Sequence, residues 1–124
     1  MSGFGIDLEK KTLANEHFRE VLFTAPHSQL VVMALQPGEN IGLEVHEEHD
    51  QFIRVEAGDG KAVIDGEEFE LHDGFAVVIP AGAQHDIING TDSIMKLYTL
   101  YTPPEHADGT VHHTKAEAEA AEHH

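Results

Sequence analysis

The chain has 124 residues, with 7 Lys and Arg against 23 Asp and Glu, and its formal net charge is -16. This charge makes nucleic acid and anionic membrane surfaces unfavourable partners, because both attract basic residues and repel carboxylates. The absence of Cys excludes disulfide scaffolds, thiolate metal sites and thiol nucleophiles. A chain of this length is expected to form one domain with a single core.

The first residues have neither the basic start nor the apolar run of a leader sequence, and no stretch of the chain has about eighteen apolar residues in succession. We therefore expect a soluble, cytoplasmic protein that does not contact a membrane.

Short segments with a hydrophobic period of two follow one another through the middle of the chain, and each ends at turn residues such as Pro37-Gly38 or Asp73-Gly74. This pattern predicts strands. Asp65-Gly66 predicts a tight hairpin, because both positions of such a turn need positive φ. In chain order the expected strands are 28–36, 41–46, 51–56, 61–64, 67–71, 75–79, 85–88 and 94–101. Strands at this spacing predict an all-β sandwich or barrel.

The two ends of the chain are poorer in apolar residues than the middle. We expect an N-terminal segment over residues 1–20, a β domain over 21–102, and a C-terminal extension and tail over 103–124. Thr114 and Glu117 form a capping-box pattern ahead of good helix formers. The sequence therefore predicts a short helical tail, and its lack of an apolar face predicts a solvated, frayed helix.

Eleven histidines are many for this length. Most have positions typical of surface residues, before the early strands, at a turn, or after the last strand: His17, His27, His72, His106, His112, His113, His123 and His124. This leaves His46, His49 and His85 as candidates for a buried site.

Glu44 and His46 are two residues apart in an expected strand, so they project from the same face. Gln51 begins the next expected strand, and it can point into the same space. His85 stands in an otherwise apolar run with Ile87 and Ile88. A single carboxylate, an amide and two imidazoles are therefore candidates to meet inside the β domain.

The spacing of these residues resembles the two motifs of the cupin family. The second cupin motif is Gly, five residues, Pro-x-Gly, two residues, His, three residues, Asn, and this chain fills it completely with Gly74, Pro80, Gly82, His85 and Asn89. The frame of the first motif is met by Gly38, Glu44, His46, Gln51 and Gly58. Glu44 stands where a cupin usually has His, and Gln51 stands where it usually has Glu. The resemblance covers residues 28–101.

The resemblance implies a small double-stranded β-barrel of the jelly-roll type, with the four motif positions meeting in one mouth. It also implies a metal site formed by Glu44, His46, Gln51 and His85. The carboxylate lost at Gln51 is regained at Glu44, so the donors still suit one divalent transition metal: Fe, Mn, Ni or Zn. A carboxylate near two imidazoles, with no Lys or Arg expected close by, favours a bound cation.

Two alternatives remain open at this site. His49 is a rival to Gln51 as the fourth ligand, because it lies three residues from His46 and imidazole binds metals more strongly than an amide. Cupins without metal also exist, in which case Glu44 and Gln51 would hydrogen-bond with each other and with His46.

Three functions are compatible with this site. The first is a dioxygenase-like enzyme acting on a small oxygen-bearing substrate, with Glu44 as the catalytic residue. The second is a binding or sensing protein for a small ligand. The third is a sugar-phosphate isomerase-like cupin, which is less favoured because phosphate needs cationic partners and the β region has only Arg54, Lys61 and Lys96. By analogy with small cupins we also expect a homodimer, in which the edge at Val21-Leu22-Phe23 is covered.

Overall fold

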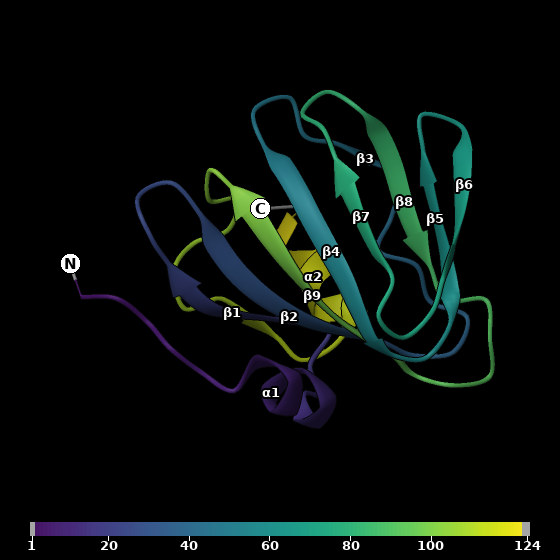
Figure 1. The fold of residues 1–124 in the computed structure, drawn as a ribbon, viewed down its shortest axis with the longest axis horizontal. Coiled ribbons are helices and arrows are strands. Elements are labelled where there is room, and N and C mark those ends of the chain that lie inside the picture. Colours follow the sequence, from purple (N-terminus) through teal and green to yellow (C-terminus); the bar gives the residue numbers. More distant parts are fainter. Residues whose placement is uncertain (1, 123–124) are drawn as a thin grey trace.

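The computed structural model describes residues 2–122. Its strands form two antiparallel sheets that face each other across the core (Figure 1). The larger sheet has the order β10-β1-β2-β9-β4-β7, and the smaller one has the order β3-β8-β5-β6. The strands are Arg19–Thr24 (β1), Gln29–Leu35 (β2), Glu44–Val45 (β3), Asp50–Ala57 (β4), Gly60–Ile64 (β5), Glu67–Leu71 (β6), Ala76–Ile79 (β7), Gln84–Ile88 (β8), Met95–Thr102 (β9) and Val111–His112 (β10). The predicted all-β jelly-roll barrel is confirmed.

Most predicted strands agree with the observed ones within a residue or two, and β6 has the predicted bounds. The predicted hairpin also forms, because Asp65 and Gly66 have φ of 47° and 82° between β5 and β6. The segment 41–46 differs, since only Glu44 and Val45 form strand β3. There Gly42 has a φ of 123°, and its amide donates to a carboxylate oxygen of Asp86 instead of to a strand partner.

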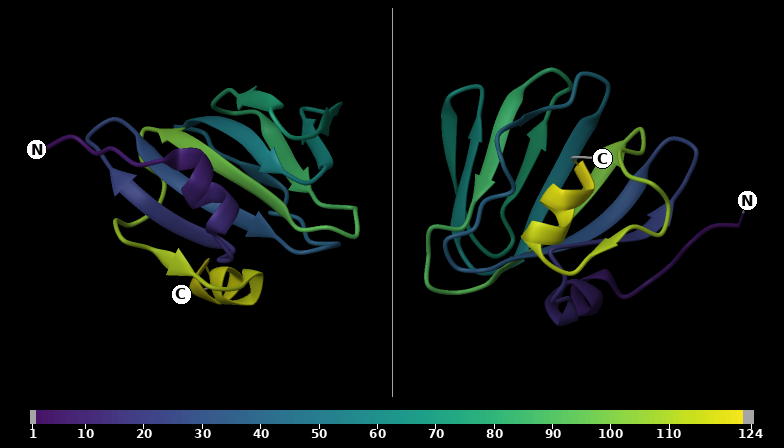
Figure 2. Two further views of the ribbon diagram at one scale, coloured as in Figure 1. Left: turned by 60° about the horizontal axis from the view of Figure 1, so that its bottom comes forward. Right: turned by 180° about the vertical axis from the view of Figure 1, so that it is seen from behind.

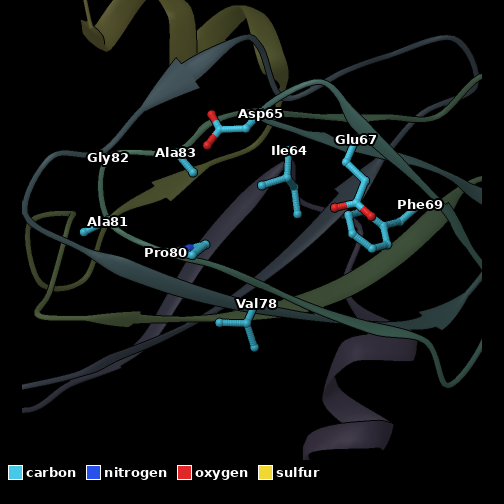
Figure 3. Close-up of a pocket in the computed structure, with 9 residues that line it drawn as sticks. All are labelled: Ile64, Asp65, Glu67, Phe69, Val78, Pro80, Ala81, Gly82 and Ala83. Carbon is cyan, nitrogen blue, oxygen red and sulfur yellow. The ribbon is translucent and has the colours of Figure 1, made fainter.

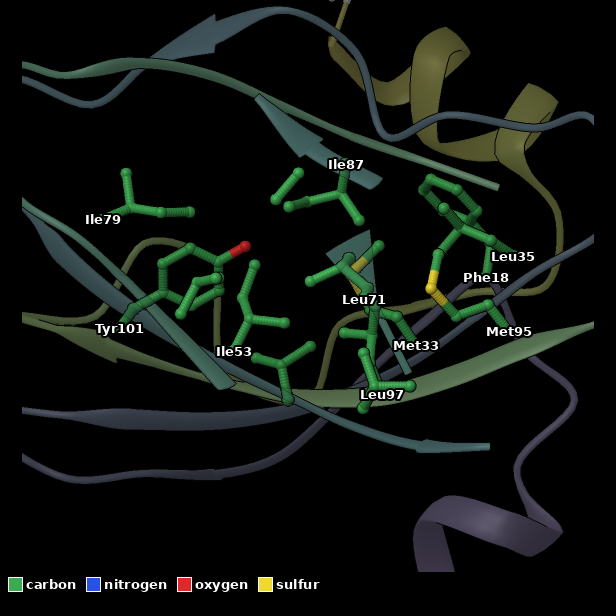
Figure 4. Packing of buried hydrophobic residues seen from close by; sticks show 14 of the residues in the cluster. Phe18, Met33, Leu35, Ile53, Leu71, Ile79, Ile87, Met95, Leu97 and Tyr101 are labelled. Carbon is green, nitrogen blue, oxygen red and sulfur yellow. The ribbon is translucent and has the colours of Figure 1, made fainter. Parts of the chain in front are cut away.

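The core lies between the sheets and is filled by alternate residues of the inner strand faces. Val31, Met33 and Leu35 of β2 are fully buried, as are Ile53 and other aliphatic residues of β4 and β9 (Figure 4). Each such side chain stabilises the fold by about 1.5 to 3 kcal/mol relative to exposure. The inner faces also carry buried polar residues, namely Arg19, Gln29, Gln51, His85 and Thr99. The barrel interior therefore combines an apolar core with a polar region, which we call the barrel mouth.

Two residues of the matched motifs hold the turns that shape the barrel. Asn89 is fully buried, and its side-chain amide donates to the carbonyls of Leu35 and Ser93. Gly58 follows β4 at a φ of 87°, and a Cβ there would lie 2.5 Å from the Ile94 carbonyl oxygen. Asn89 and Gly58 therefore stabilise the backbone conformation of these turns and take no part in the chemistry of the mouth.

The helices pack at opposite faces of the larger sheet (Figure 2). Helix α1 (Leu8–Ala14) begins after Asp7, which accepts a hydrogen bond from the Lys10 amide, and it contacts β2, β4 and β9. Helix α2 (Lys115–Glu122) follows β10 and begins after Thr114, whose hydroxyl accepts from the Glu117 amide. No helix within residues 2–122 is both long and apolar enough to cross a membrane.

The C-terminal helix is not the frayed, solvated element that its sequence predicts. Ala118 is only 3% exposed and belongs to the core cluster, and the Lys115 ammonium donates to the Asn40 side chain at 2.6 Å. The single buried side chain of Ala118 joins the helix to the core, and the helix also contacts β10. The expectation of a helical tail is therefore confirmed, and the expectation that it lacks tertiary contacts is wrong.

Candidate metal centre in the barrel mouth

Strands of both sheets place the predicted site residues around the mouth. Glu44 of β3 lies opposite His85 of β8 in the strand register, and the rings of His46 and His85 are 5.2 Å apart. Gln51 is the second residue of β4 in the other sheet, where it lies opposite Tyr101. The Tyr101 ring is in turn 6.0 Å from the His46 ring. Gln51 and His85 are both 4% exposed, so these two residues are inside the barrel.

Glu44 and His46 form an ion pair, with 3.1 Å between Oε2 and Nε2. Burial alone would raise the pKa of Glu44, but the hydrogen bond with His46 and the charges of His46, Arg19 and His85 bring that pKa below its ordinary value. The same hydrogen bond to Glu44 raises the pKa of His46, against the opposing effects of burial and Arg19. Glu44 is therefore an ionised carboxylate at neutral pH.

Hydrogen bonds fix one polar atom of Gln51 and one of His85 and leave the other available. Gln51 Nε2 donates to the Thr99 hydroxyl at 3.0 Å, while Gln51 Oε1 is buried without a hydrogen-bond partner. His85 Nδ1 lies 3.0 Å from the Ala83 carbonyl oxygen. Because a carbonyl only accepts, this contact puts a proton on Nδ1 and leaves the Nε2 lone pair for a ligand. Such an outer hydrogen bond is what orients a metal-binding imidazole.

The donors fit a divalent cation in type, although they are not drawn together around one point. Among residues 2–122 no three His, Asp or Glu side chains are close enough to form a metal-binding group. One candidate donor is an amide, and Glu44 contacts His46 directly. Two ligands at right angles on one metal, with bonds of about 2.1 Å, are about 3 Å apart. The 3.1 Å contact of Glu44 with His46 is therefore also the spacing of neighbouring ligands.

Both ring nitrogens of His49 contact oxygen atoms of the C-terminal extension. Its Nδ1 lies 2.7 Å from the Pro103 carbonyl oxygen, and its Nε2 lies 2.7 Å from Glu105 Oε2. Each ring nitrogen of His49 therefore already has an oxygen atom of the C-terminal extension beside it. Gln51, in contrast, keeps its buried oxygen free.

Glu105 is a site residue that the sequence did not reveal. Besides contacting His49, its carboxylate lies 3.7 Å from His46 Nδ1, on the opposite side of the ring from Glu44. Its backbone amide donates to Gln29 Oε1, which also accepts from the His106 amide. Gln29 Nε2 donates to the His106 carbonyl at 2.7 Å. The fully buried Gln29 amide thus fixes the C-terminal extension beside the mouth.

The expectation that all tail histidines face solvent is wrong for His106. Its ring packs edge-on to Tyr101 at 5.2 Å, and its Nε2 is buried without a hydrogen-bond partner. Burial, followed by the positive charge of Arg19, lowers the pKa of His106 to about 3. His112 is half-buried, with Nδ1 3.2 Å from an Arg19 nitrogen, and His113 is exposed as expected. His123 and His124 lie outside the described residues.

The premise that no Lys or Arg approaches the site is also wrong. Arg19 is 3% exposed and projects inward from β1, and its charge influences Glu44, His46 and His106. It lies before the first strand that the periodicity predicts, which is why the sequence did not reveal it. Arg54 faces the outer side of β4 as predicted, where it contacts Glu56.

The mouth is reached through an open pocket of about 600 Å³. Its walls are the segment around β3, which includes Glu44 and His46, together with Glu105 and Glu119 of the C-terminal region. A second pocket lies between the β5–β6 hairpin and the turn Pro80–Ala83 (Figure 3). That pocket has Asp65 and Glu67 but none of the predicted metal ligands. The first pocket therefore leads to the candidate site.

Comparison with known proteins agrees with this geometry. The cupin domain family model matches residues 31–101. Protein YrkC of Bacillus subtilis is 42% identical over 125 residues, which cover 96% of this chain and 67% of YrkC. A protein of Acanthamoeba polyphaga mimivirus is 40% identical over 110 residues, which cover 86% of this chain and 69% of the mimivirus protein.

The crystal structure of BH2720 from Bacillus halodurans is similar over nearly the whole length, with a TM-score of 0.94 and 42% identity. The match covers 96% of this chain and 95% of BH2720, so it extends well beyond residues 31–101. The family model covers more than half of the chain, and the chain belongs to the cupin family.

Proposed function

We propose that the barrel mouth binds one divalent transition metal through Glu44, His46, Gln51 and His85. The observation that carries this proposal is the buried, unpartnered Oε1 of Gln51, a residue that lies opposite Tyr101 in the strand register, with the Tyr101 ring 6.0 Å from the His46 ring. An orphaned buried acceptor costs about 1 to 3 kcal/mol, and a cation at this point removes that cost. The outer hydrogen bonds from Gln51 to Thr99 and from His85 to Ala83 support the same assignment.

We further propose that the protein is a metal-dependent, dioxygenase-like enzyme for a small oxygen-bearing substrate. A bound Fe, Mn, Ni or Zn ion would supply Lewis-acid chemistry to substrate oxygens, and Fe, Mn or Ni would also supply a centre for dioxygen. Glu44 is the catalytic residue, since its ionised Oε2 can accept a proton from the substrate and return it. Glu105 holds His46 from the outer side, and the pocket beside β3 admits the substrate.

Elemental analysis of the full-length protein tests the metal. Adventitious metal binding by C-terminal histidines is first excluded with His113→Ala, His123→Ala and His124→Ala, because cutting the chain before His113 would remove α2. The protein is expected to retain about one equivalent of metal, and His85→Ala is expected to lose it. His72→Ala serves as the matched control, since His72 is exposed. Equal metal content in the His85→Ala and His72→Ala proteins would contradict the proposal.

Oxygen uptake with a 1,3-diketone such as acetylacetone tests the enzyme. Metal-loaded protein is expected to consume oxygen, and Glu44→Gln is expected to reduce kcat while the diketone still binds. Saturable diketone binding without oxygen uptake would instead support a binding or sensing protein.

We also propose a homodimer, by analogy with other small cupins. The expected edge strand is partly covered by the chain itself, because β10 pairs with Arg19 and Glu20 and the Phe4 ring stacks on Phe23 at 5.0 Å. The remaining part of β1, Leu22–Thr24, and the exposed Val111 of β10 form the edge where a second copy would pair. Sedimentation at micromolar concentration tests this, and a monomer would contradict it.

A further inference from the structure

Arg19 is a buried cation inside the barrel. It is 3% exposed, and it projects from the same face of β1 as Val21, which belongs to the core cluster. Among residues 2–122, Arg19 is the one Lys or Arg that is buried. A guanidinium in this position loses its hydration and needs an anion or several hydrogen bonds in return.

No carboxylate of residues 2–122 forms an ion pair with this guanidinium. Its Nη1 lies 3.2 Å from His112 Nδ1, and the guanidinium carbon lies 5.3 Å from the centre of the Phe18 ring. Arg19 Nε is buried without a hydrogen-bond partner. One donor of a buried positive charge is therefore left unused.

This unused donor belongs to the same region as two other orphaned atoms. His106 Nε2 and Gln51 Oε1 are also buried without partners. His106 packs on one side of Tyr101, at 5.2 Å, and His46 lies 6.0 Å from that same ring. The charge of Arg19 affects both histidines and Glu44, which places the guanidinium within electrostatic range of the candidate metal centre.

We propose that Arg19 binds the carboxylate of a small ligand in the barrel mouth, so that the preferred substrate is a small oxygen-bearing monocarboxylate and a neutral diketone such as acetylacetone is a poorer one. In this proposal Arg19 Nε and His106 Nε2 donate hydrogen bonds to the carboxylate oxygens. The ligand's other oxygen faces Gln51 and His85. A singly charged group fits better than a phosphate, because Glu44, Glu105 and Glu119 line the entrance and would repel a dianion more strongly. This carboxylate site gives the substrate class of the enzyme proposed above. It rests on the proposed function only in that both place the ligand in the barrel mouth.

Isothermal titration with glycolate, its neutral amide glycolamide, and inorganic phosphate tests the assignment. Glycolate is expected to bind wild-type protein at least about tenfold more tightly than glycolamide, since a charge-assisted hydrogen bond is roughly twice as strong as a neutral one. Arg19→Met keeps the length and apolar character of the side chain and is expected to abolish this preference. Arg54→Met is the matched control, because Arg54 is on the outer side of β4, and it should leave the preference unchanged.

The selectivity of the wild-type protein keeps the proposal testable even if Arg19→Met fails to fold. Glycolamide that binds as tightly as glycolate, phosphate that binds more tightly than glycolate, or no binding of any probe would each overturn it. The titrations are run on protein stripped of metal with a chelator and on Mn²⁺-loaded protein. A preference for glycolate that persists in stripped protein supports the role of Arg19 even where the metal proposal fails. If the protein binds Mn²⁺ but shows no preference for glycolate, the metal proposal stands and the proposed role of Arg19 is overturned.

Discussion

The barrel and the segments that flank it contribute different things to the mouth. Residues 31–101, which match the family model, supply the donor atoms of Glu44, His46, Gln51 and His85. The flanking segments supply charge and support, through Arg19 before the matched region and Glu105 and His106 after it. Under the proposals above, the matched barrel determines where a ligand binds, and the flanking segments influence which ligand it accepts.

The largest expected effect concerns Gln29, which joins the two regions. Gln29→Leu would leave the amide and carbonyl of His106 and the amide of Glu105 without their partner. We expect the free energy of unfolding to fall by about 2 to 3 kcal/mol, and proteolysis between residues 103 and 110 to become faster. Urea denaturation and limited digestion measure the two effects. The control is Gln84→Leu, since Gln84 is exposed, and equal behaviour of the two variants would show that the extension is not held by Gln29.

A smaller effect is expected from the pH dependence of His106. Its pKa in the folded protein is about 3, below the value of about 6.5 in an unfolded chain, so the unfolded state takes up the proton first as the pH falls. The stability that depends on neutral His106 is therefore complete above about pH 6.5 and is lost progressively from there towards pH 3.

Between pH 7 and pH 5 the wild-type protein should lose about 1 to 2 kcal/mol of unfolding free energy more than His106→Gln, which does not titrate. Urea titrations of both proteins at the two pH values measure this difference. Parallel pH dependence in the two proteins would show that His106 is not held neutral between Tyr101 and Arg19.

The smallest expected effect is that of Glu105, which supports His46 without binding a ligand itself. Glu105→Gln keeps the shape of the side chain but removes the charge facing His46 Nδ1 and His49 Nε2. We expect the dissociation constant for Mn²⁺ to rise about tenfold, as is typical when an outer partner of a metal-binding histidine is removed. Glu48→Gln, at an exposed loop position, should leave it unchanged. If both variants bind Mn²⁺ like the wild type, Glu105 has no part in the centre.

The sequence predicts the barrel better than it predicts the flanks, and the reason is physical. Strand alternation and turn residues are local, so the strands, the Asp65-Gly66 hairpin and the shared face of Glu44 and His46 follow from them. The position of His106 depends instead on a hydrogen bond to Gln29, 77 residues away in the chain. Arg19 likewise becomes an inner residue of a sheet strand only once β1 pairs with β2 and β10. Local patterns contain no information about such pairings.

The sequence predicts the proposed metal ligands less well than the strands of the barrel and better than the flanking segments. Motif spacing predicts which residues approach the mouth, and the structure pairs Glu44 with His85 in the strand register and places the His46 ring 5.2 Å from the His85 ring, without gathering the three side chains around one point. Spacing favours Gln51 over His49 as the proposed fourth ligand, and the contacts of both His49 ring nitrogens with Pro103 and Glu105, which no local pattern predicts, support the same preference.

The most direct test of the metal centre is an anomalous difference map from crystals of the full-length protein grown with Mn²⁺. We expect one strong peak in the barrel mouth, within about 2.3 Å of His46 Nε2, His85 Nε2 and Gln51 Oε1, with Glu44 as a further ligand. A peak found only at exposed histidines such as His17 and His113, or no peak in the mouth at all, would contradict it.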